Sequence, residues 1–586
     1  MRSSARVLVS CLVASAQCWN LFGEAKLKRR EDSPAPSDFL RRAFASAIVV
    51  GDYLYIDGGE VSQLFNGRNS SASLPSWPVN STLSVHLGES WTNSTVTFRS
   101  TPKTGAPKLN KQALWRDPAA TAFYAWGGIT SYFAQPPANE LWRFEVDGAG
   151  GGAWARAATP RNNLVALAQL VRATDGAFAQ SKDVGYYFGG FASEQTDTSV
   201  SGPDSYLAVP GLVAYNMTSG DLKNVSSTGF GGWGNLVGGA AQFVPFGTDG
   251  LLVFMGGGQG PIATKWGGWK DVDFNEVRLY NPQTDKWHTQ QTTGSRPTRR
   301  EKFCTVGVPG PNNTYEIFLY GGMNSQTSTT SDEVYVLSLP GFVFFKANGP
   351  STKRADQACV VVGQRQMLSV GGTDGFLGYP NSLTDPDPWA SGLGVFDLTQ
   401  MKWVDGYNAH AEAYESPEVV RQWYNQGGLE SVVWASEEVR MLFATSAAAN
   451  STSEPTATGH TGEKVTSSQE SSPEAQETNS SQPPVGAVIG GVAGGIIGLA
   501  LVIALVWILV WRRRRRYAAA PQLSNELISP AQPVTEYWAP KGSATVTTVR
   551  HEVHSDLYNP SELPGDYGVA EVNAPHGRQE IGRTDS

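Results

Sequence analysis

Cysteine and histidine are scarce in this chain of 586 residues, which has four Cys and seven His. Cys11 and Cys18 lie near the N-terminus, and only His86, His288 and His410 belong to the part of the chain with strand-like patterns. We find no set of these residues with the spacing of a metal site and no G-x-S-x-G motif of a serine nucleophile. We therefore predict no catalytic residue, no metal site and no cofactor, and we interpret the histidines as surface residues.

Charged residues are also few, at 17% of the chain, and the net charge is −8. This acidic balance gives no indication of a nucleic-acid partner, because nucleic acids bind to basic patches. Sustained helical periodicity is missing before residue 480, whereas short apolar and aromatic runs bounded by Gly, Pro and Asn recur throughout. These absences favour an all-β fold.

Glycine, in contrast, is abundant, with 64 residues, and six apolar runs end in two consecutive glycines. One example is "YYFGG" at residues 186–190, and another is "IFLYGG" at residues 317–322. The pairs lie 50 to 69 residues apart and are Gly58 and Gly59, Gly127 and Gly128, Gly189 and Gly190, Gly256 and Gly257, Gly321 and Gly322, and Gly371 and Gly372. Because glycine takes positive φ and lets another backbone come close, we predict that each pair ends a strand beside a neighbouring unit.

Each glycine pair belongs to a unit of four predicted strands. An apolar run precedes the glycine strand, as in residues 44–50 and 164–171, and a third apolar run follows a polar loop. The fourth segment often carries an aromatic residue, namely Trp154, Trp287, Phe344 or Trp403. A self-similar unit of this length predicts a repeat architecture.

The pattern resembles the kelch repeat over roughly residues 43–405. This resemblance implies a six-bladed kelch β-propeller, with one blade for each repeat and with insertions in the loops that follow the glycines. None of the pairs is followed by GxxxxGK[ST], so the glycines are interpreted as part of the architecture and not as a phosphate-binding loop.

The resemblance implies two functions of different class. Galactose oxidase has a propeller of the same type with copper held by His and Tyr, but this chain has no Tyr-His pair and no early Cys placed for a thioether link. We therefore predict a non-enzymatic module that binds a protein partner or a cell-wall glycan through loops on one face. The alternative is a galactose-oxidase-like or lyase-type enzyme on the same scaffold, since fold alone does not decide function.

Both ends of the chain carry targeting or membrane signals. Residues 1–16 combine a basic start, an apolar stretch and a small-residue cleavage site, which predicts a signal peptide. Residues 17–37 are predicted to form an N-terminal propeptide segment with a dibasic site that ends at Arg30. The uncharged run 485–511 is followed directly by Arg512–Arg516, which predicts one transmembrane helix with its basic end in the cytoplasm.

The remaining segments complete this layout. Residues 38–445 are assigned to the propeller and a C-terminal extension, which either supplies a strand that closes the ring or packs under it. Residues 446–484, rich in Ser, Thr, Pro and Glu, predict a stalk, and residues 512–586 predict a disordered cytoplasmic tail. The layout resembles that of fungal single-pass cell-surface kelch proteins. That resemblance implies the plasma membrane or another secretory-pathway membrane, with the propeller extracellular or lumenal.

Glycosylation sequons support this orientation, because all of them precede the predicted membrane span. Asparagine acceptors belong on the lumenal side of secretory membranes. The acceptors are Asn69, Asn80, Asn93, Asn216, Asn224, Asn312, Asn450 and Asn479.

The predicted membrane span also contains a glycine stripe. Gly486, Gly490, Gly494 and Gly498 recur every four residues. Small residues at this spacing are typical of helices that associate in lipid, which predicts homo-association through the span.

Three tryptophans on glycine-flanked loops are the best candidates for a binding site. Trp233 lies in "GFGGWGN", and Trp266 and Trp269 lie in "TKWGGWKD". Exposed rings on loops suit stacking on a sugar or anchoring of a protein partner. The alternative is that these rings pack against the propeller.

Two further features have more than one interpretation. Asp385 and Asp387 lie in a loop with Asp-Pro pairs that favours turns over a calcium site, since its spacing matches no EF-hand. Cys304 and Cys359 occupy matching positions in the predicted first strands of adjacent repeats, each five residues after an arginine. They either form a disulfide or remain two buried thiols, and the sequence leaves both open.

The membrane orientation can be tested directly. We expect glycosidase treatment to lower the mass of fragments N-terminal to the span only, because every sequon lies there. Protease added to intact cells should spare an epitope fused after Ser586. Loss of that epitope from intact cells would reverse the predicted orientation.

Overall fold

The structure, a computed structural model, describes residues 30–158, 167–202, 205–264, 269–349 and 352–444. These residues all belong to the first of two units, residues 1–538, and the second unit, 539–586, lies outside them. The predicted signal peptide, stalk, transmembrane run and tail fall outside the described residues. Within the described residues, no helix is both long and apolar enough to cross a membrane.

Within the described residues, six sheets follow one another along the chain, and each contains four antiparallel strands whose spatial order is their order in the chain. Sheet 1 contains β2 (Ser46–Val50), β3 (Tyr53–Asp57), β6 (Ser81–His86) and β8 (Arg99–Pro102); sheet 2 contains β9 (Ala113–Arg116), β10 (Ala122–Trp126), β11 (Trp142–Val146) and β12 (Gly152–Arg156); sheet 3 contains β13 (Ala177–Gln180), β14 (Val184–Phe188), β17 (Leu212–Asn216) and β18 (Leu222–Val225). Sheet 4 contains β19 (Ala240–Val244), β20 (Leu251–Met255), β24 (Glu276–Asn281) and β25 (Lys286–Gln291); sheet 5 contains β27 (Cys304–Pro309), β28 (Tyr315–Tyr320), β31 (Val334–Leu339) and β32 (Val343–Lys346), with β26 (Thr293–Gly294) added; sheet 6 contains β33 (Ala358–Val362), β34 (Gln366–Val370), β35 (Leu393–Asp397) and β36 (Lys402–Val404).

Shorter elements occupy the connections. The small sheets are β1 (Phe39–Ala43), β4 (Glu60–Gln63) and β5 (Trp77–Pro78); β15 (Phe191–Ala192), β16 (Tyr206–Ala208) and β22 (Ala263–Thr264); β21 (Gly258–Gln259) and β23 (Lys270–Asp271); β29 (Met323–Asn324) and β30 (Thr329–Thr330); and β7 (Trp91–Thr92) and β37 (Gly406–Tyr407). The helices are α3 (Asn381–Thr384), α4 (Glu418–Asn425), the 3₁₀ turn Gly428–Ser431 and α5 (Glu437–Ala444).

The predicted all-β, propeller-like architecture is confirmed, with two local corrections. Residues 164–171 were predicted as the first strand of sheet 3, but that strand is β13, and residues 167–169 are helical. Residues 177–180 form the first strand because the tight turn at residues 181–183 pairs them with β14. The second correction is α3, a single helical turn inside a loop of the repeat region.

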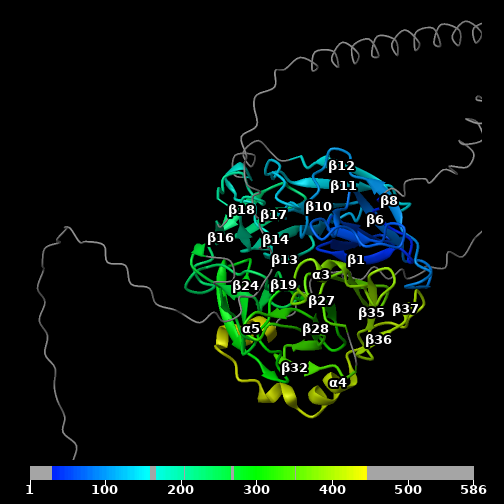
Figure 1. Ribbon diagram of the computed structural model, residues 1–586. Helices are drawn as coiled ribbons and strands as arrows, with labels where there is room; N and C mark the ends of the chain where they lie inside the picture. The colour runs from blue at the N-terminus through cyan, green and yellow to red at the C-terminus, as the bar shows by residue number, and fades with distance from the viewer. Residues whose placement is uncertain (1–29, 159–166, 203–204, 265–268, 350–351, 445–586) are drawn as a thin grey trace, which may run out of the picture. The chain divides into compact units, whose positions relative to one another are not determined.

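The six sheets are arranged in a closed ring. The first strands contact one another in the cycle β2, β9, β13, β19, β27, β33 and back to β2, and each pair of neighbouring sheets encloses its own buried apolar cluster. The cluster between the first and last sheets joins Leu54 and Leu83 to Leu368 and Val395. Figure 1 shows β13, β19 and β27 toward the centre, with β12, β18, β32 and β36 further out.

The ring closes without a strand shared between its ends, because sheets 1 and 6 are each built from one stretch of chain. Instead, β37 pairs with β7, and the hydroxyl of Tyr407 donates to the carbonyl of Leu87 at 2.9 Å. Figure 1 shows the blue strands of sheet 1 beside the yellow-green strands of sheet 6. Hydrogen bonds and apolar packing between the two ends therefore close the ring.

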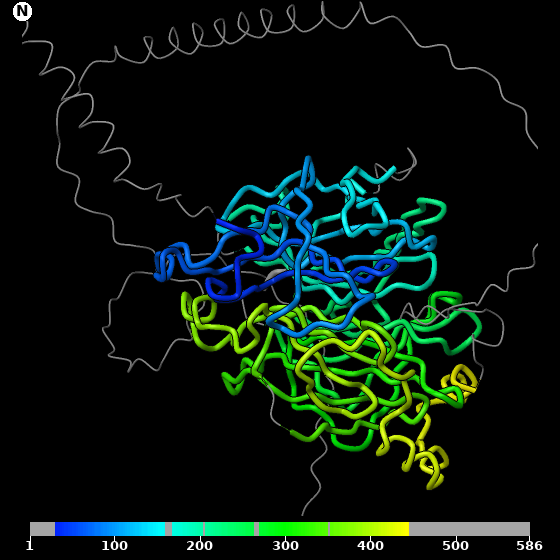
Figure 2. Tube along the Cα trace, turned by 90° about the vertical axis from the view of Figure 1, so that its right-hand side faces the viewer, coloured from blue at the N-terminus to red at the C-terminus, as the bar shows by residue number. Residues whose placement is uncertain are grey.

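The C-terminal extension, residues 418–444, forms helices and contains no strand. Val420 of α4 packs in the cluster between sheets 5 and 6, and Phe443 of α5 packs against Phe246 and Phe342 with ring centroids 4.8 Å from each. Figure 2 shows these yellow helices on the outside of the green strands. Of the two sequence-based alternatives, packing against the ring is the one found.

The double glycines end the second strand of every sheet, as predicted, and all twelve have φ between 60° and 98°. A Cβ atom on Gly58 would lie 2.1 Å from the carbonyl oxygen of Leu109 in the next sheet. A Cβ atom on Gly371 would lie 2.5 Å from the oxygen of Arg42, across the junction between sheets 6 and 1. The amide of Gly372 also donates to this Arg42 oxygen at 2.9 Å. The glycines therefore allow backbone contact between neighbouring sheets.

Replacing Gly371 by alanine should destabilise the ring more than replacing a glycine in open space. Gly67 is the matched control, because its φ is 72° and a Cβ atom there would meet nothing within 4 Å. Left-handed strain alone should cost each variant about 1–2 kcal/mol. Gly371→Ala should lose roughly 2 kcal/mol more, because its Cβ overlaps a backbone oxygen. Equal losses in denaturant unfolding of the two variants would contradict this role for the close approach.

Candidate functional site

Six residues, each two positions before the first strand of its sheet, encircle one end of the ring. These mouth residues are Phe44, Lys111, Asp175, Gly238, Lys302 and Asp356, and all have φ between 54° and 66°. Backbone amides of four of them donate to the carbonyl of the equivalent residue in the preceding sheet, at 2.7–3.0 Å: Lys111 to Phe44, Gly238 to Asp175, Lys302 to Gly238 and Asp356 to Lys302. The left-handed conformation turns each chain sharply, so that six chains can meet around one axis.

An ion-paired lysine spans this mouth. The Nζ atom of Lys111 lies 2.9 Å from Asp175 Oδ1 and 2.6 Å from Asp356 Oδ1. Burial disfavours the charged form of Lys111, but the two carboxylates outweigh it and raise its pKa. Burial likewise works against the charge of Asp356, yet Lys111 and Lys302 hold the pKa of that carboxyl below its usual value. The bridge therefore stays charged at neutral pH and joins sheets 2, 3 and 6.

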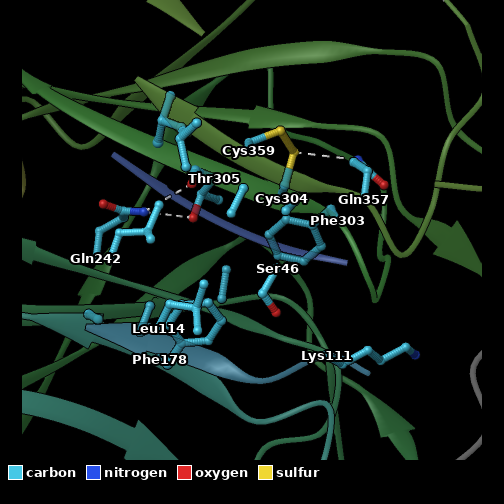
Figure 3. A pocket seen from close by; sticks show the side chains of 18 of the residues that line it. Ser46, Lys111, Leu114, Phe178, Gln242, Phe303, Cys304, Thr305, Gln357 and Cys359 are labelled. Carbon is cyan, nitrogen blue, oxygen red and sulfur yellow. Dashed lines mark hydrogen bonds between the residues drawn. A yellow bond between two sulfur atoms is a disulfide. The ribbon is translucent and has the colours of Figure 1, made fainter. Parts of the chain in front are cut away.

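A central channel of 320 Å³ lies behind the mouth and is lined by the first strands of all six sheets. Side chains tie neighbouring first strands together along its wall. The side chain of Gln180 accepts from the amide of Arg116 at 2.6 Å, and Gln242 donates to the hydroxyl of Thr305 at 2.9 Å. Figure 3 shows Gln242 beside Thr305, with Leu114 and Phe178 on the facing wall.

Cys304 and Cys359 form a disulfide between β27 and β33 on this wall, with Cα atoms 5.5 Å apart. Their positions do not match, contrary to the sequence interpretation, because Asp356 corresponds to Lys302 and Cys359 therefore to Thr305. Successive side chains in a strand point to opposite faces. The offset of one residue makes Cys304 face sheet 6 and Cys359 face sheet 5, where both sulfurs join the apolar cluster between these sheets.

The three candidate tryptophans differ in their surroundings. Trp233 is 43% exposed in the connection between β18 and β19, and Trp266 lies outside the described residues. Trp269 is half-buried and packs on Phe191, with ring centroids 5.7 Å apart. Phe191 belongs to a small loop cluster on the glycine side of sheets 2 to 4, formed by Ile129, Phe191, Tyr206, Ala208, Val237 and Trp269.

Loops around this cluster carry exposed apolar side chains. Phe133 is 60% exposed in the connection between β10 and β11, and Ile262 is 55% exposed in the connection between β20 and β24. Asn235 joins the loop of Trp233 to that of Ile262, because its side chain donates to Gly260 O at 2.8 Å. Phe133, Trp233 and Ile262 are the glycine-side apolar residues considered below.

The aspartate loop is held by arginines. Asp387 is fully buried and accepts from Arg354 Nη1 at 2.9 Å, and Arg354 stacks on Trp389 at 3.9 Å from the ring centroid. Asp385 is half-exposed and lies 3.3 Å from Arg41. This arrangement agrees with a structural role for the loop, whose backbone also contacts β1 through Asp387 N and Leu40 O at 2.8 Å.

Histidines and acidic residues form no metal-binding group within the described residues. His288 lies on the outer strand β25, where burial lowers its pKa, and His86 is exposed at the end of β6. Neither residue lies on one of the first strands that line the channel.

Six of the predicted glycan acceptors lie within the described residues. Asn69, Asn80, Asn224 and Asn312 are exposed, and Asn93 and Asn216 are half-buried. Asn450 and Asn479 lie outside the described residues.

The mouth residues and the Arg354–Asp387 pair were not found from the sequence. A usable signal exists for the mouth, because a small residue stands two positions after every mouth residue: Ser46, Ala113, Ala177, Ala240, Cys304 and Ala358. Small side chains are needed where six strands converge. The Arg354–Asp387 pair has no such signal, since it joins two loops of different length.

No family model matches the chain. The chain is 24% identical over 432 residues to a kelch repeat-containing protein of Arthroderma benhamiae, and the aligned part covers 65% of this chain and 59% of the relative. The chain thus spans about three fifths of the relative's length. This similarity confirms the resemblance to kelch-repeat proteins predicted from the double glycines.

Removing the buried Asp387 should destabilise the protein strongly. Asp387→Ala leaves Arg354 buried and unpaired, so we expect a loss of about 3–5 kcal/mol. Asp385→Ala is the matched control and should lose less than about 1 kcal/mol, since Asp385 is half-exposed. Adding Ca²⁺ or a chelator should leave the melting temperature of the unmodified protein unchanged, and a clear rise with Ca²⁺ would favour a cation site in this loop.

Proposed function

We propose that the six sheets are the blades of a kelch propeller that works as a recognition module for a protein partner. The observation that carries this proposal is the set of glycine-side apolar residues, Phe133, Trp233 and Ile262, which are 60%, 43% and 55% exposed. Large apolar side chains grouped on one face of a soluble domain are typical of binding surfaces. Aromatic side chains of this kind are frequent binding hot spots.

The scaffold beneath these residues supports such a role. The loop cluster around Phe191 packs loops of sheets 2, 3 and 4 together, and the amide of Thr130 donates to Gln195 O at 3.1 Å between sheets 2 and 3. Loops held by packing lose less conformational entropy when a partner binds. Trp269 belongs to this support, whereas Trp233 is available for contact.

The sequons are arranged in a way that favours the same face. Asn93 and Asn312 lie in connections at the end of the sheets opposite the double glycines, Asn216 is the last residue of β17 at that same end, and Asn224 lies on an outer strand. Asn69 and Asn80 are on the glycine side but belong to sheet 1. Glycans at these positions would leave the glycine side of sheets 2 to 4 uncovered.

The propeller is further proposed to be extracellular or lumenal, anchored by residues 485–511 in the plasma membrane or another secretory-pathway membrane. The sequons and Arg512–Arg516 support this orientation. Recognition is favoured over turnover because the charged groups at the mouth, Lys111, Asp175 and Asp356, are paired with one another. An oxidase or lyase would need such groups to converge on a substrate.

The triple variant Phe133→Ser, Trp233→Ser and Ile262→Ser tests the proposed surface. Because these side chains are exposed, its melting temperature should change by less than about 3 °C. Proteins cross-linked to the full chain on intact cells should be lost. The control Leu429→Ser and Val433→Ser removes exposed apolar groups from the C-terminal extension and should retain them. Unchanged cross-linking by the triple variant would refute this surface.

A further inference from the structure

Phe178 is exposed inside the molecule, in the wall of the central channel. It lies on β13, the first strand of sheet 3, and 42% of its surface is accessible. Its neighbours Ala177 and Ala179 are small and pack in the cluster between sheets 3 and 4. A phenylalanine ring facing water at the centre of a ring of sheets loses the stabilisation that burial of its area would give, about 25 cal/mol for each Å². The ring is therefore suited to contact something that enters the channel.

The wall around Phe178 is mixed in polarity. Figure 3 shows Leu114 beside Phe178, with Thr305 on the opposite wall. The first strand ends each sheet on its inner side, so backbone donors and acceptors of six strands border the channel. The charged side chains of the lining lie at its two ends, with Lys111, Lys302, Asp175 and Asp356 at the mouth, where two positive charges balance two negative ones, and Arg116 at the opposite end. This wall favours an uncharged ligand with one apolar face and several hydroxyl or amide groups.

The size of the channel limits the ligand. Its volume is 320 Å³. Small-molecule pockets begin at about 300 Å³, so the channel accommodates a molecule of monosaccharide size. The Lys111 bridge spans one mouth, so entry is from the opposite end, beside Arg116 and Gln180.

We propose that the central channel binds a neutral molecule of monosaccharide size, with its apolar face on the Phe178 ring and its hydroxyl groups toward Thr305 and the inner strand edges. This site is separate from the glycine-side apolar residues and does not depend on the recognition function proposed for them. The propeller would then carry two binding sites, one for a macromolecule on its loops and one for a small polar ligand along its axis.

Saturation-transfer NMR on the full chain tests the channel with defined probes. The panel is D-glucose, D-galactose, D-mannose and N-acetyl-D-glucosamine, with glucuronate and glucosamine as charged counterparts, in a detergent that contains no sugar. At least one neutral probe should bind. Phe178→Ala should weaken that binding at least about fivefold, because an aromatic contact is lost. Thr305→Val, which keeps the side-chain shape, should also weaken it.

Phe133→Ala is the matched control, since Phe133 is an exposed phenylalanine on the loop face and outside the channel. It should leave binding of the probe unchanged. The proposal is overturned if no neutral probe binds, if Phe133→Ala weakens binding as much as Phe178→Ala, or if the charged counterparts bind as well as the neutral sugars. Because Phe178 is exposed, Phe178→Ala should retain the melting temperature of the unmodified protein, and a retained melting temperature with lost binding supports the site.

Discussion

The close approach of one sheet's backbone to the next is the constraint on which this structure depends. At the end of each second strand the chain turns with positive φ, and in five of the six pairs a carbonyl that leads into the following sheet lies close enough to the first glycine to exclude a Cβ atom. Glycine meets both demands, and the second glycine of each pair packs against the segment that leads into the first strand of its own sheet. Gly371 and Gly372 make the same kind of backbone contact with Arg42. The contact that links neighbouring sheets therefore also joins sheet 6 to sheet 1 and closes the ring.

The ring imposes a second condition on the residues near its axis. Six chains arrive at one point, so the mouth residues all adopt left-handed φ and the residues two positions later are small. Once the mouth is this narrow, one long side chain can span it, and Lys111 does so between Asp175 and Asp356. The bridge is thus a consequence of convergence.

The loops are less constrained than the sheets, and function is proposed to reside there and along the axis. Insertions after the double glycines build the loop cluster around Phe191, on which Trp233 and Ile262 stand exposed. The aspartate loop has a different use, because Asp387 neutralises Arg354 beneath the junction of sheets 6 and 1. Similar loops in one repeat protein can therefore serve either packing or recognition, according to what lies under them.

The sequence by itself determined the repeat, the order of strands and the place of every double glycine, because these follow from local periodicity and from the conformations open to glycine. It also placed Cys304 and Cys359 on neighbouring first strands. Only the tertiary structure decided the offset of one residue that lets their sulfurs meet, the helical packing of residues 418–444, and the packing of Trp269 on Phe191 while Trp233 stays exposed. These features depend on contacts between segments that are distant along the chain. The local sequence pattern does not show which face of a strand packs against which neighbouring sheet. The mouth, its lysine bridge and the exposed ring of Phe178 therefore form only when the six sheets are arranged around one axis.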